Sequence, residues 1–267
     1  MRPVLLLVHS LDTSLVIWYT SYMTSYHIAT YLVGGAVRDG LLGIQSKDLD
    51  YTVTVDGAET VDAAWSAMRG HLETQGFTIF LETPEYFTIR AKFPKGHVNE
   101  KITADFVLAR EEGPYSDGRR PDWVKPGTLE QDLSRRDFTV NALAKAEDGT
   151  IIDLWEGRED LRYRVLDSVG DPRERFLEDA LRVFRALRFM ITKDFALHPR
   201  VKQAMHNVGV MDKVEEVSVE RIREEMHRCF AHDTVRTVSV LVHEFPELLG
   251  VMDRKGIRLM PTLKEKM

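Results

Sequence analysis

The sequence predicts an α+β fold in which a strand-containing first half is followed by a second half built from helices. Residues 28–56 indicate, in order, a strand, a Gly-Gly turn, a short helix, a loop and a second strand. Three more runs rich in β-formers follow between residues 77 and 108. From Asp171 onward the apolar residues recur almost everywhere at helical spacing. The change of character after Gly149 predicts a domain boundary near residues 148–150.

The composition is that of an ordinary globular protein, with 43% hydrophobic and 29% charged residues in a chain of 267. The formal net charge of −6 mildly opposes a nucleic-acid-binding class, because such proteins are often basic, but it allows local basic stripes. Cys229 is the one cysteine. A disulfide framework or a cysteine-based zinc site within one chain is therefore excluded, which fits a reducing compartment.

The N-terminal residues 1–28 contain an apolar run after Arg2 that faintly resembles a signal peptide. The run is short and no small-residue cleavage site clearly follows it, so we expect an extra strand or helix, or a poorly ordered extension. No stretch approaches the ~20 apolar residues that a membrane helix needs. The sequence therefore predicts no membrane partner and a cytoplasmic location.

Two aspartates, Asp48 and Asp50, stand at the start of the second strand-like run. Side chains two residues apart on a strand point to the same face. Two adjacent carboxylates repel each other unless a cation lies between them, and hard oxygen ligands of this kind suit Mg²⁺. The spacing therefore predicts a metal site.

A glycine pair, Gly34-Gly35, separates the first strand from the short helix expected over residues 36–42. Glycine lets the backbone approach a ligand closely, and the first N–H groups of a helix are available to phosphate. A phosphate-binding turn beside a two-carboxylate metal site predicts nucleotidyl transfer.

Asp105 lies inside the third of the later strand-like runs, which otherwise is largely apolar. An Asp buried alone in such a strand is costly. One interpretation is an exposed edge position. The other is that Asp105 lies beside Asp48 and Asp50 on a neighbouring strand and completes a three-carboxylate metal site.

A polar cluster follows a Gly- and Pro-rich segment, residues 111–130, whose length suits a functional or mobile loop. If residues 133–143 form a helix, Asp137 and Asn141 share a face, and Arg135 or Arg136 extends its polar side. These residues are either the solvated start of a helix or a clamp for triphosphate and ribose.

The helix predicted over residues 176–190 has a wide apolar stripe and an opposite polar side. Asp179, Arg182 and Arg185 lie on that polar side, with Arg188 at its margin. They are either surface ion pairs or donors and acceptors that match the edge of a base. A further helix is predicted over residues 217–230, where Glu220, Arg221 and Glu225 could brace the previous helix. One more is expected over residues 234–249, broken near Pro246.

Taken together, the sequence resembles the bacterial-type (class II) tRNA nucleotidyltransferases, or CCA-adding enzymes, and their relatives the bacterial poly(A) polymerases. Five motifs occur in that family's order between about Tyr31 and Phe230. They are Gly34-Gly-Ala-Val-Arg-Asp39 with Asp48-Leu-Asp50, Arg135-Arg-Asp-Phe-Thr-Val-Asn-Ala142, the hinge-like Asp153, Gly157 and Asp160, Glu178-Asp-Ala-Leu-Arg182 continuing to Phe189, and Glu220-Arg-Ile-Arg-Glu-Glu225.

The resemblance implies a palm-like nucleotidyltransferase head with a mixed sheet, followed by an all-α neck and body. The head would span residues 29–148, the neck with its nucleotide-selecting helix residues 149–205, and the body residues 206–267. Family members usually continue with a helical tail that holds the tRNA elbow. Because this chain ends at Met267, we expect that tail to be absent.

The resemblance also assigns site residues. Asp48 and Asp50 would bind two Mg²⁺ ions, one activating the 3′-hydroxyl of the RNA and the other holding the triphosphate, with Asp105 as the third catalytic carboxylate. Asp179 and Arg182 would read the base edge of CTP or ATP. The other implied nucleotide-binding residues are Gly34, Gly35, Arg38, Arg110, Arg136, Asp137, Asn141, Arg185 and Arg188.

The implied activity is template-independent addition of CMP and AMP, from CTP and ATP, to the 3′ end of tRNA. A-adding, CC-adding and poly(A) polymerase activities on an RNA 3′ end stay open. A non-catalytic RNA- or nucleotide-binding remnant is an alternative of another class, and the three retained carboxylates argue against it. The oligomeric state is left open by the sequence.

Overall fold

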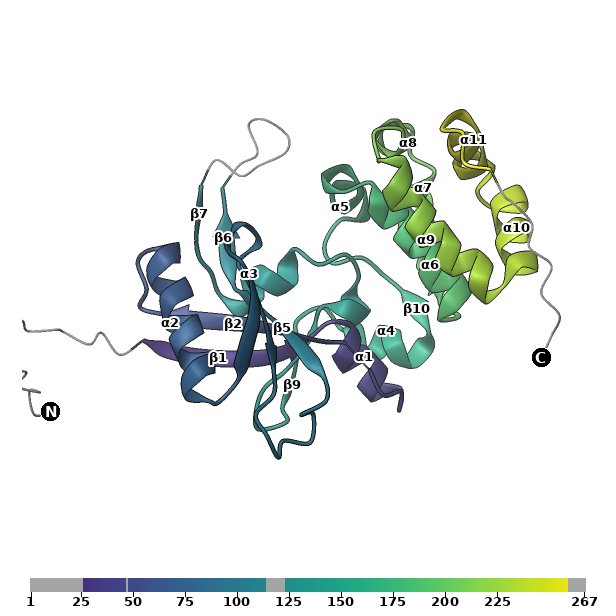
Figure 1. The fold of residues 1–267 in the computed structure, drawn as a ribbon. Helices are drawn as coiled ribbons and strands as arrows, with labels where there is room; N and C mark the ends of the chain where they lie inside the picture. The colour runs from purple at the N-terminus through teal and green to yellow at the C-terminus, as the bar shows by residue number, and fades with distance from the viewer. Residues whose placement is uncertain (1–25, 47, 114–122, 259–267) are drawn as a thin grey trace, which may run out of the picture.

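The computed structural model describes residues 26–46, 48–113 and 123–258. A unit of strands and helices is followed by a group of helices, as the sequence predicts (Figure 1). Nearly all of the expected N-terminal extension, and the last nine residues of the basic C-terminal end, lie outside the described residues. Within the described part, none of the helices combines the length and the apolar character needed to cross a membrane.

Seven strands form one mixed sheet, which confirms the expected palm-like head. Their order is β3-β4-β5-β2-β1-β8-β9. β2 and β5 pair in parallel, and the other neighbouring strands pair antiparallel. The strands are β1 (His27–Val33), β2 (Leu49–Asp56), β3 (Thr78–Thr83), β4 (Thr88–Lys92), β5 (Thr103–Leu108), β8 (Leu143–Lys145) and β9 (Ile151–Asp153).

The alternation of side chains along β2 separates the core from the site. Val53 is fully buried in an apolar cluster with α2 (Val61–Thr74) and with Phe106 of β5. Tyr51 stacks on Phe106, their ring centroids 5.0 Å apart. Because odd-numbered positions of β2 face this cluster, Asp50 faces the opposite side of the sheet.

Shorter elements surround the sheet. β6 and β7 pair as an antiparallel ribbon that projects from it (Figure 1). The segment expected as a loop over residues 111–130 thus has paired ends, and its central residues 114–122 lie outside the described part. The bounds are α1 (Gly35–Leu41), η1 (Pro84–Tyr86), β6 (Arg110–Glu112), β7 (Val124–Pro126), α3 (Leu129–Ser134), η2 (Thr139–Asn141) and α4 (Gly157–Tyr163).

The second half packs around α6, which buries eight of its 12 residues and lies beside α9 (Figure 1). Its apolar cluster extends into the first half through Phe138 and Val140, so both halves share a core. The elements are β10 (Val165–Leu166), α5 (Pro172–Glu178), α6 (Leu181–Thr192), β11 (Ala196–Leu197), α7 (Pro199–Met205), α8 (Val208–Val214), α9 (Val219–His232), α10 (Thr234–His243) and α11 (Pro246–Arg254).

Three sequence-based boundaries differ from the structure. The helix predicted over residues 176–190 is broken at Asp179, whose backbone is extended between α5 and α6. Its Oδ1 accepts a hydrogen bond from the Leu181 N–H at 3.2 Å, so local capping replaces helical continuation. Residues 133–143 form the end of α3, η2 and the start of β8 instead of one helix. The boundary expected at residues 148–150 falls between β8 and β9, and the sheet continues to Asp153.

The hinge-like motif is a tight packing point between the sheet and α4. Asp153 accepts hydrogen bonds from the N–H groups of Gly157 and Arg158, at 2.8 and 2.9 Å. A Cβ on Gly157 would lie 2.2 Å from the carbonyl oxygen of Thr139. Asp160 accepts a 2.6 Å hydrogen bond from the hydroxyl of the same threonine. The motif therefore fixes α4 against η2.

We expect Gly157→Ala to lower the free energy of unfolding by at least about 2 kcal/mol, because backbone atoms cannot move aside as a flexible side chain could. Gly40→Ala is the matched control. No heavy atom lies within 4 Å of a Cβ added there. The control should raise stability by roughly 0.5–1 kcal/mol, since alanine favours a helix interior. Urea unfolding of both variants checks this, and equal effects would contradict the packing argument.

Candidate active site

A polar cleft of about 580 Å³ lies where the sheet, α1, η2, α6 and α9 meet. It gathers residues that are far apart in the sequence. Of the catalytic and nucleotide-binding residues that the resemblance implies, 12 line it: Gly34, Gly35, Arg38, Asp48, Asp50, Arg136, Asp137, Asn141, Asp179, Arg182, Arg185 and Arg188. Asp105 and Arg110 do not line it.

Asp48 and Asp50 are exposed at one wall of the cleft. Within the described part of the chain, neither carboxylate makes a side-chain hydrogen bond or an ion pair. The pKa of Asp50 is raised above its ordinary value, first by the loss of hydration in its surroundings and then by the negative charges of Asp105 and Asp48. Two unpaired carboxylates side by side are a donor set that fits a divalent cation.

The third expected carboxylate is held by an arginine. Asp105 is the register partner of Asp50 on β5, and Arg90 is its partner on β4. The guanidinium of Arg90 donates to both oxygens of Asp105, each at 2.6 Å. Among the described residues, no three acidic, histidine or cysteine side chains are placed to hold one metal ion. Asp105 is thus next to the expected metal site without joining a three-carboxylate group.

Arg110 points elsewhere. Its Nη1 donates to the carbonyl of Tyr86 at 3.3 Å, and its guanidinium lies 5.0 Å from the ring centroid of Phe87. It borders a cavity of about 1030 Å³ that adjoins the cleft, since Arg135, Asp179 and Arg182 line both. Arg110 therefore lies in the neighbouring cavity and does not line the cleft itself.

The Gly34 turn is shaped to admit an arginine. Its φ of 67° lies in the left-handed region, and a Cβ there would lie 2.8 Å from Nη1 of Arg136. Arg136 is fixed by Asp132 of α3, to which it donates at 3.1 Å. Burial alone would raise the pKa of Asp132, but Arg136 and Arg135 hold it below its ordinary value. The turn thus brings a positive charge against the backbone that is expected to bind phosphate.

A buried chain of hydrogen bonds connects α1, η2 and α6. Arg38 donates from Nη1 to Asn141 Oδ1 at 2.5 Å, and Asn141 donates from Nδ2 to Asp137 Oδ1 at 2.9 Å. Arg185 completes the chain by donating to Asp137 Oδ2 at 2.8 and 2.5 Å. Burial would raise the pKa of Asp137, but Arg185 and the hydrogen bonds hold it below its ordinary value.

The chain of polar contacts continues at both ends. Arg38 also pairs with Asp39, which receives Lys193 from the end of α6 at 3.2 Å. On α9, the buried Glu225 accepts a hydrogen bond from Arg188 and lies 3.9 Å from Arg185. The predicted bracing role of Glu225 is confirmed. Most of the arginines expected to bind triphosphate are therefore already oriented by acidic or amide partners.

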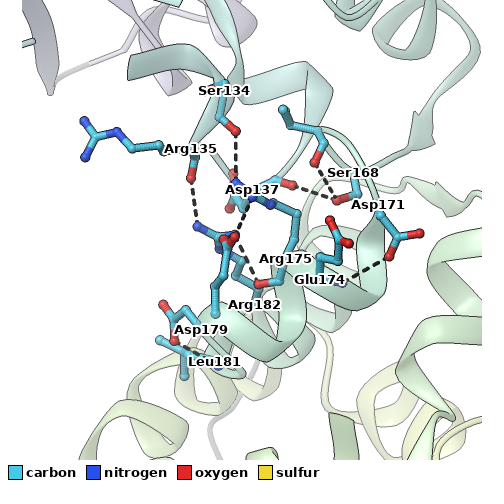
Figure 2. A network of polar contacts seen from close by, with 12 residues as sticks. Ser134, Arg135, Asp137, Ser168, Asp171, Glu174, Arg175, Asp179, Leu181 and Arg182 are labelled. Atoms are coloured by element: carbon cyan, nitrogen blue, oxygen red, sulfur yellow. Dashed lines mark hydrogen bonds and ion pairs between the residues drawn. The ribbon is translucent and has the colours of Figure 1, made fainter. Parts of the chain in front are cut away.

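Asp179 and Arg182 line the same cleft. Arg182 donates to the backbone carbonyls of Arg135 and Arg175, at 2.8 and 3.1 Å (Figure 2). Asp179 pairs with Arg221 of α9 at 3.0 Å, which confirms the bracing predicted for Arg221. These contacts hold both side chains in the wall of the cleft.

Four further residues matter to this site and were not assigned by the sequence. Arg228 lines the cleft from α9, two helical turns after Arg221, and that seven-residue spacing is a signal that could have found it. Asp132 pairs with Arg136 at i, i+4, a spacing that is visible in the sequence. Arg90 acts through Asp105, and Asp39 through Lys193. No local pattern indicates these last two pairings, because they depend on how the chain folds.

Replacing Asp137 by Asn tests whether this buried carboxylate joins the two halves. We expect a loss of about 3 kcal/mol in the free energy of unfolding at pH 7, since the partner charge of Arg185 stays buried. The pKa of Asp137 is lowered on folding, so its stabilising effect is complete above the unfolded pKa of about 3.9 and lost as the pH falls through the folded value. The difference between the two proteins should therefore shrink below about pH 4.

Asp56→Asn is the control, because this carboxylate is largely exposed at the end of β2. Urea unfolding between pH 7 and pH 3 measures both variants. A loss as small as that of the control at pH 7 would refute the role of Asp137.

Comparison with known proteins agrees with the fold. Residues 30–167 match the model of the poly(A) polymerase head domain. A CCA-adding enzyme of Levilactobacillus brevis is 38% identical over 197 residues, which cover 73% of this chain and 45% of that protein. The chain spans about half the length of the curated relatives it matches.

Two solved structures share the fold. The Bacillus stearothermophilus CCA-adding enzyme in complex with CTP has a TM-score of 0.66 at 31% identity, over 86% of this chain and 52% of that one. A tRNA nucleotidyltransferase complexed with a primer tRNA and an incoming ATP analog has a TM-score of 0.55 at 28% identity, over 86% and 58%. This chain therefore belongs to the poly(A) polymerase head-domain family, together with the CCA-adding enzymes that it matches.

Proposed function

We propose that this chain is an RNA nucleotidyltransferase that adds CMP and AMP, from CTP and ATP, to the 3′ end of tRNA without a template. The observation that carries the proposal is that one cleft holds both the unpaired Asp48 and Asp50 and the oriented pair Asp179 and Arg182. The first pair fits the reacting centre of phosphoryl transfer, and the second fits recognition of a base.

Positioning and charge neutralisation are what this reaction needs most. Asp48 and Asp50 would hold Mg²⁺ at the end of the cleft formed by β2. When bound there, Mg²⁺ would supply activation of the RNA 3′-hydroxyl and neutralisation of the triphosphate. The backbone of Gly34 and Gly35 would approach the phosphates, and the guanidinium groups of Arg136, Arg185 and Arg188 would offset their charge.

Asp137 and Asn141 act in this proposal as positioning groups. Asn141 accepts a hydrogen bond from Arg38, and Asp137 accepts hydrogen bonds from Arg185 and Asn141. They therefore orient both arginines before a nucleotide binds. A wall fixed in advance loses little entropy when it binds triphosphate. This differs from the direct contact with ribose and triphosphate that the sequence suggests for the same residues.

Asp179 and Arg182 would select the base. A carboxylate accepts and a guanidinium donates, so the pair can match the amino group and ring nitrogen that cytosine and adenine both present. Guanine and uracil present a carbonyl where cytosine and adenine present an amino group, and would leave donors or acceptors of the wall unpaired. One related structure holds CTP and another a primer tRNA with an incoming ATP analog, which supports cytosine and adenine as the bases selected.

The test is incubation of the full chain and Mg²⁺ with tRNAs that lack one, two or three 3′-terminal nucleotides, supplying each labelled nucleotide separately. We expect CMP on the shortest ends, AMP on ends that carry both cytidines, and no GMP or UMP. Asp48→Asn should reduce incorporation by at least about 10³-fold while leaving the unfolding transition unchanged.

Other outcomes identify the alternatives. AMP on any RNA end would indicate poly(A) synthesis, and CMP without AMP, or AMP without CMP, would indicate a partial activity. No incorporation with any nucleotide or RNA would overturn the enzyme proposal and leave a binding protein.

A further inference from the structure

We propose that Arg90 is a positioning residue of the metal site: it holds Asp105 in an ion pair, so that Asp48 and Asp50 alone supply the carboxylate ligands. The inference rests on the metal-binding part of the proposed function. It assigns a role to Arg90 that no motif of the chain indicates, and it gives Asp105 a role other than that of the third ligand.

A single row of side chains crosses the sheet at this point. Asp50 on β2, Asp105 on β5 and Arg90 on β4 are register partners in succession. Partners in register on adjacent strands point to the same face. Two negative charges and one positive charge therefore lie in line, with the positive charge at the end away from Asp48 and Asp50.

The ion pair between Arg90 and Asp105 occupies both carboxylate oxygens. Nε donates to Oδ1 and Nη2 donates to Oδ2, each at 2.6 Å, which is the fork geometry that suits guanidinium and carboxylate. Asp48 and Asp50 have no such partner within the described residues. Three neighbouring carboxylates thus divide into two that are available to a cation and one that is not.

The ion pair contributes only modestly to folding. The side chain of Arg90 is 47% exposed and that of Asp105 is 24% exposed, so water screens the pair even though its two-bond geometry is favourable. The pair acts directly on the charge of the cleft, because Asp105 is the register partner of Asp50 on the adjacent strand. By cancelling that charge, Arg90 limits how strongly the free site attracts cations and how far its carboxylates repel a triphosphate.

A double-mutant cycle on Mn²⁺ binding tests the proposal, with electron paramagnetic resonance of free Mn²⁺ as the readout. Arg90→Gln frees Asp105 and should tighten Mn²⁺ binding about fivefold. Asp105→Asn leaves the charge of Arg90 uncompensated and should weaken binding about fivefold. The double variant restores the local net charge, so its affinity should lie within about twofold of the wild-type value.

Controls separate charge from ligation and from folding. Arg69→Gln removes another exposed guanidinium, one paired with Glu82 of β3, and should leave Mn²⁺ affinity unchanged. Asp50→Asn should abolish saturable binding. Urea unfolding of each variant confirms that the fold is retained.

A double variant that loses tenfold or more would show that Asp105 is a metal ligand and would overturn the proposal, as would the absence of saturable Mn²⁺ binding to the wild-type chain. The cycle is independent of catalysis. If it succeeds while no nucleotide is incorporated, only the proposed function fails. If nucleotides are incorporated while the double variant loses Mn²⁺, only this inference fails.

Discussion

The buried carboxylate of Asp137 is the contact on which the arrangement of the cleft depends. It lies between Asn141, which receives Arg38 from α1, and Arg185, which belongs to α6 in the second half. A buried charge of this kind is tolerated only when its partners are complete. The sheet and the helices must therefore come together in one geometry for the site to exist. The apolar cluster that contains Phe138 and residues of α6 also holds the sheet and the helices together at this point.

This constraint explains why so many arginines can line one cleft. Each is held by an acid, an amide or a backbone carbonyl: Arg136 by Asp132, Arg188 by Glu225, and Arg182 by two carbonyls. The partners hold the guanidinium groups apart and in fixed orientations. The acidic partners also offset part of the positive charge. Asp48 and Asp50 differ from these arginines, because neither carboxylate forms an ion pair with a described residue. The contrast between paired guanidinium groups and unpaired carboxylates marks the part of the cleft whose donor set fits a divalent cation.

Much of this could be predicted from the sequence because the relevant signals are local. The spacing of Asp48 and Asp50, the Gly-Gly turn and the strand-like runs before residue 108 are each properties of a few neighbouring residues. The apolar spacing of residues 176–190 predicted the helix that became α6. It missed the break at Asp179, because a capping carboxylate competes with helical continuation and does not change the apolar stripe. The pairing of Arg90 with Asp105 depends on the register between β4 and β5, which no spacing within either strand reveals.

The central claim is that the free chain already carries a wall that selects its nucleotide. Calorimetric titration of the Asp48→Asn variant with CTP, ATP, GTP and UTP, each with Mg²⁺ and without RNA, tests it most directly. We predict that CTP and ATP bind at least about tenfold more tightly than GTP and UTP, because a mismatched base leaves polar atoms of the wall unpaired. Equal affinity for all four nucleotides would contradict the account.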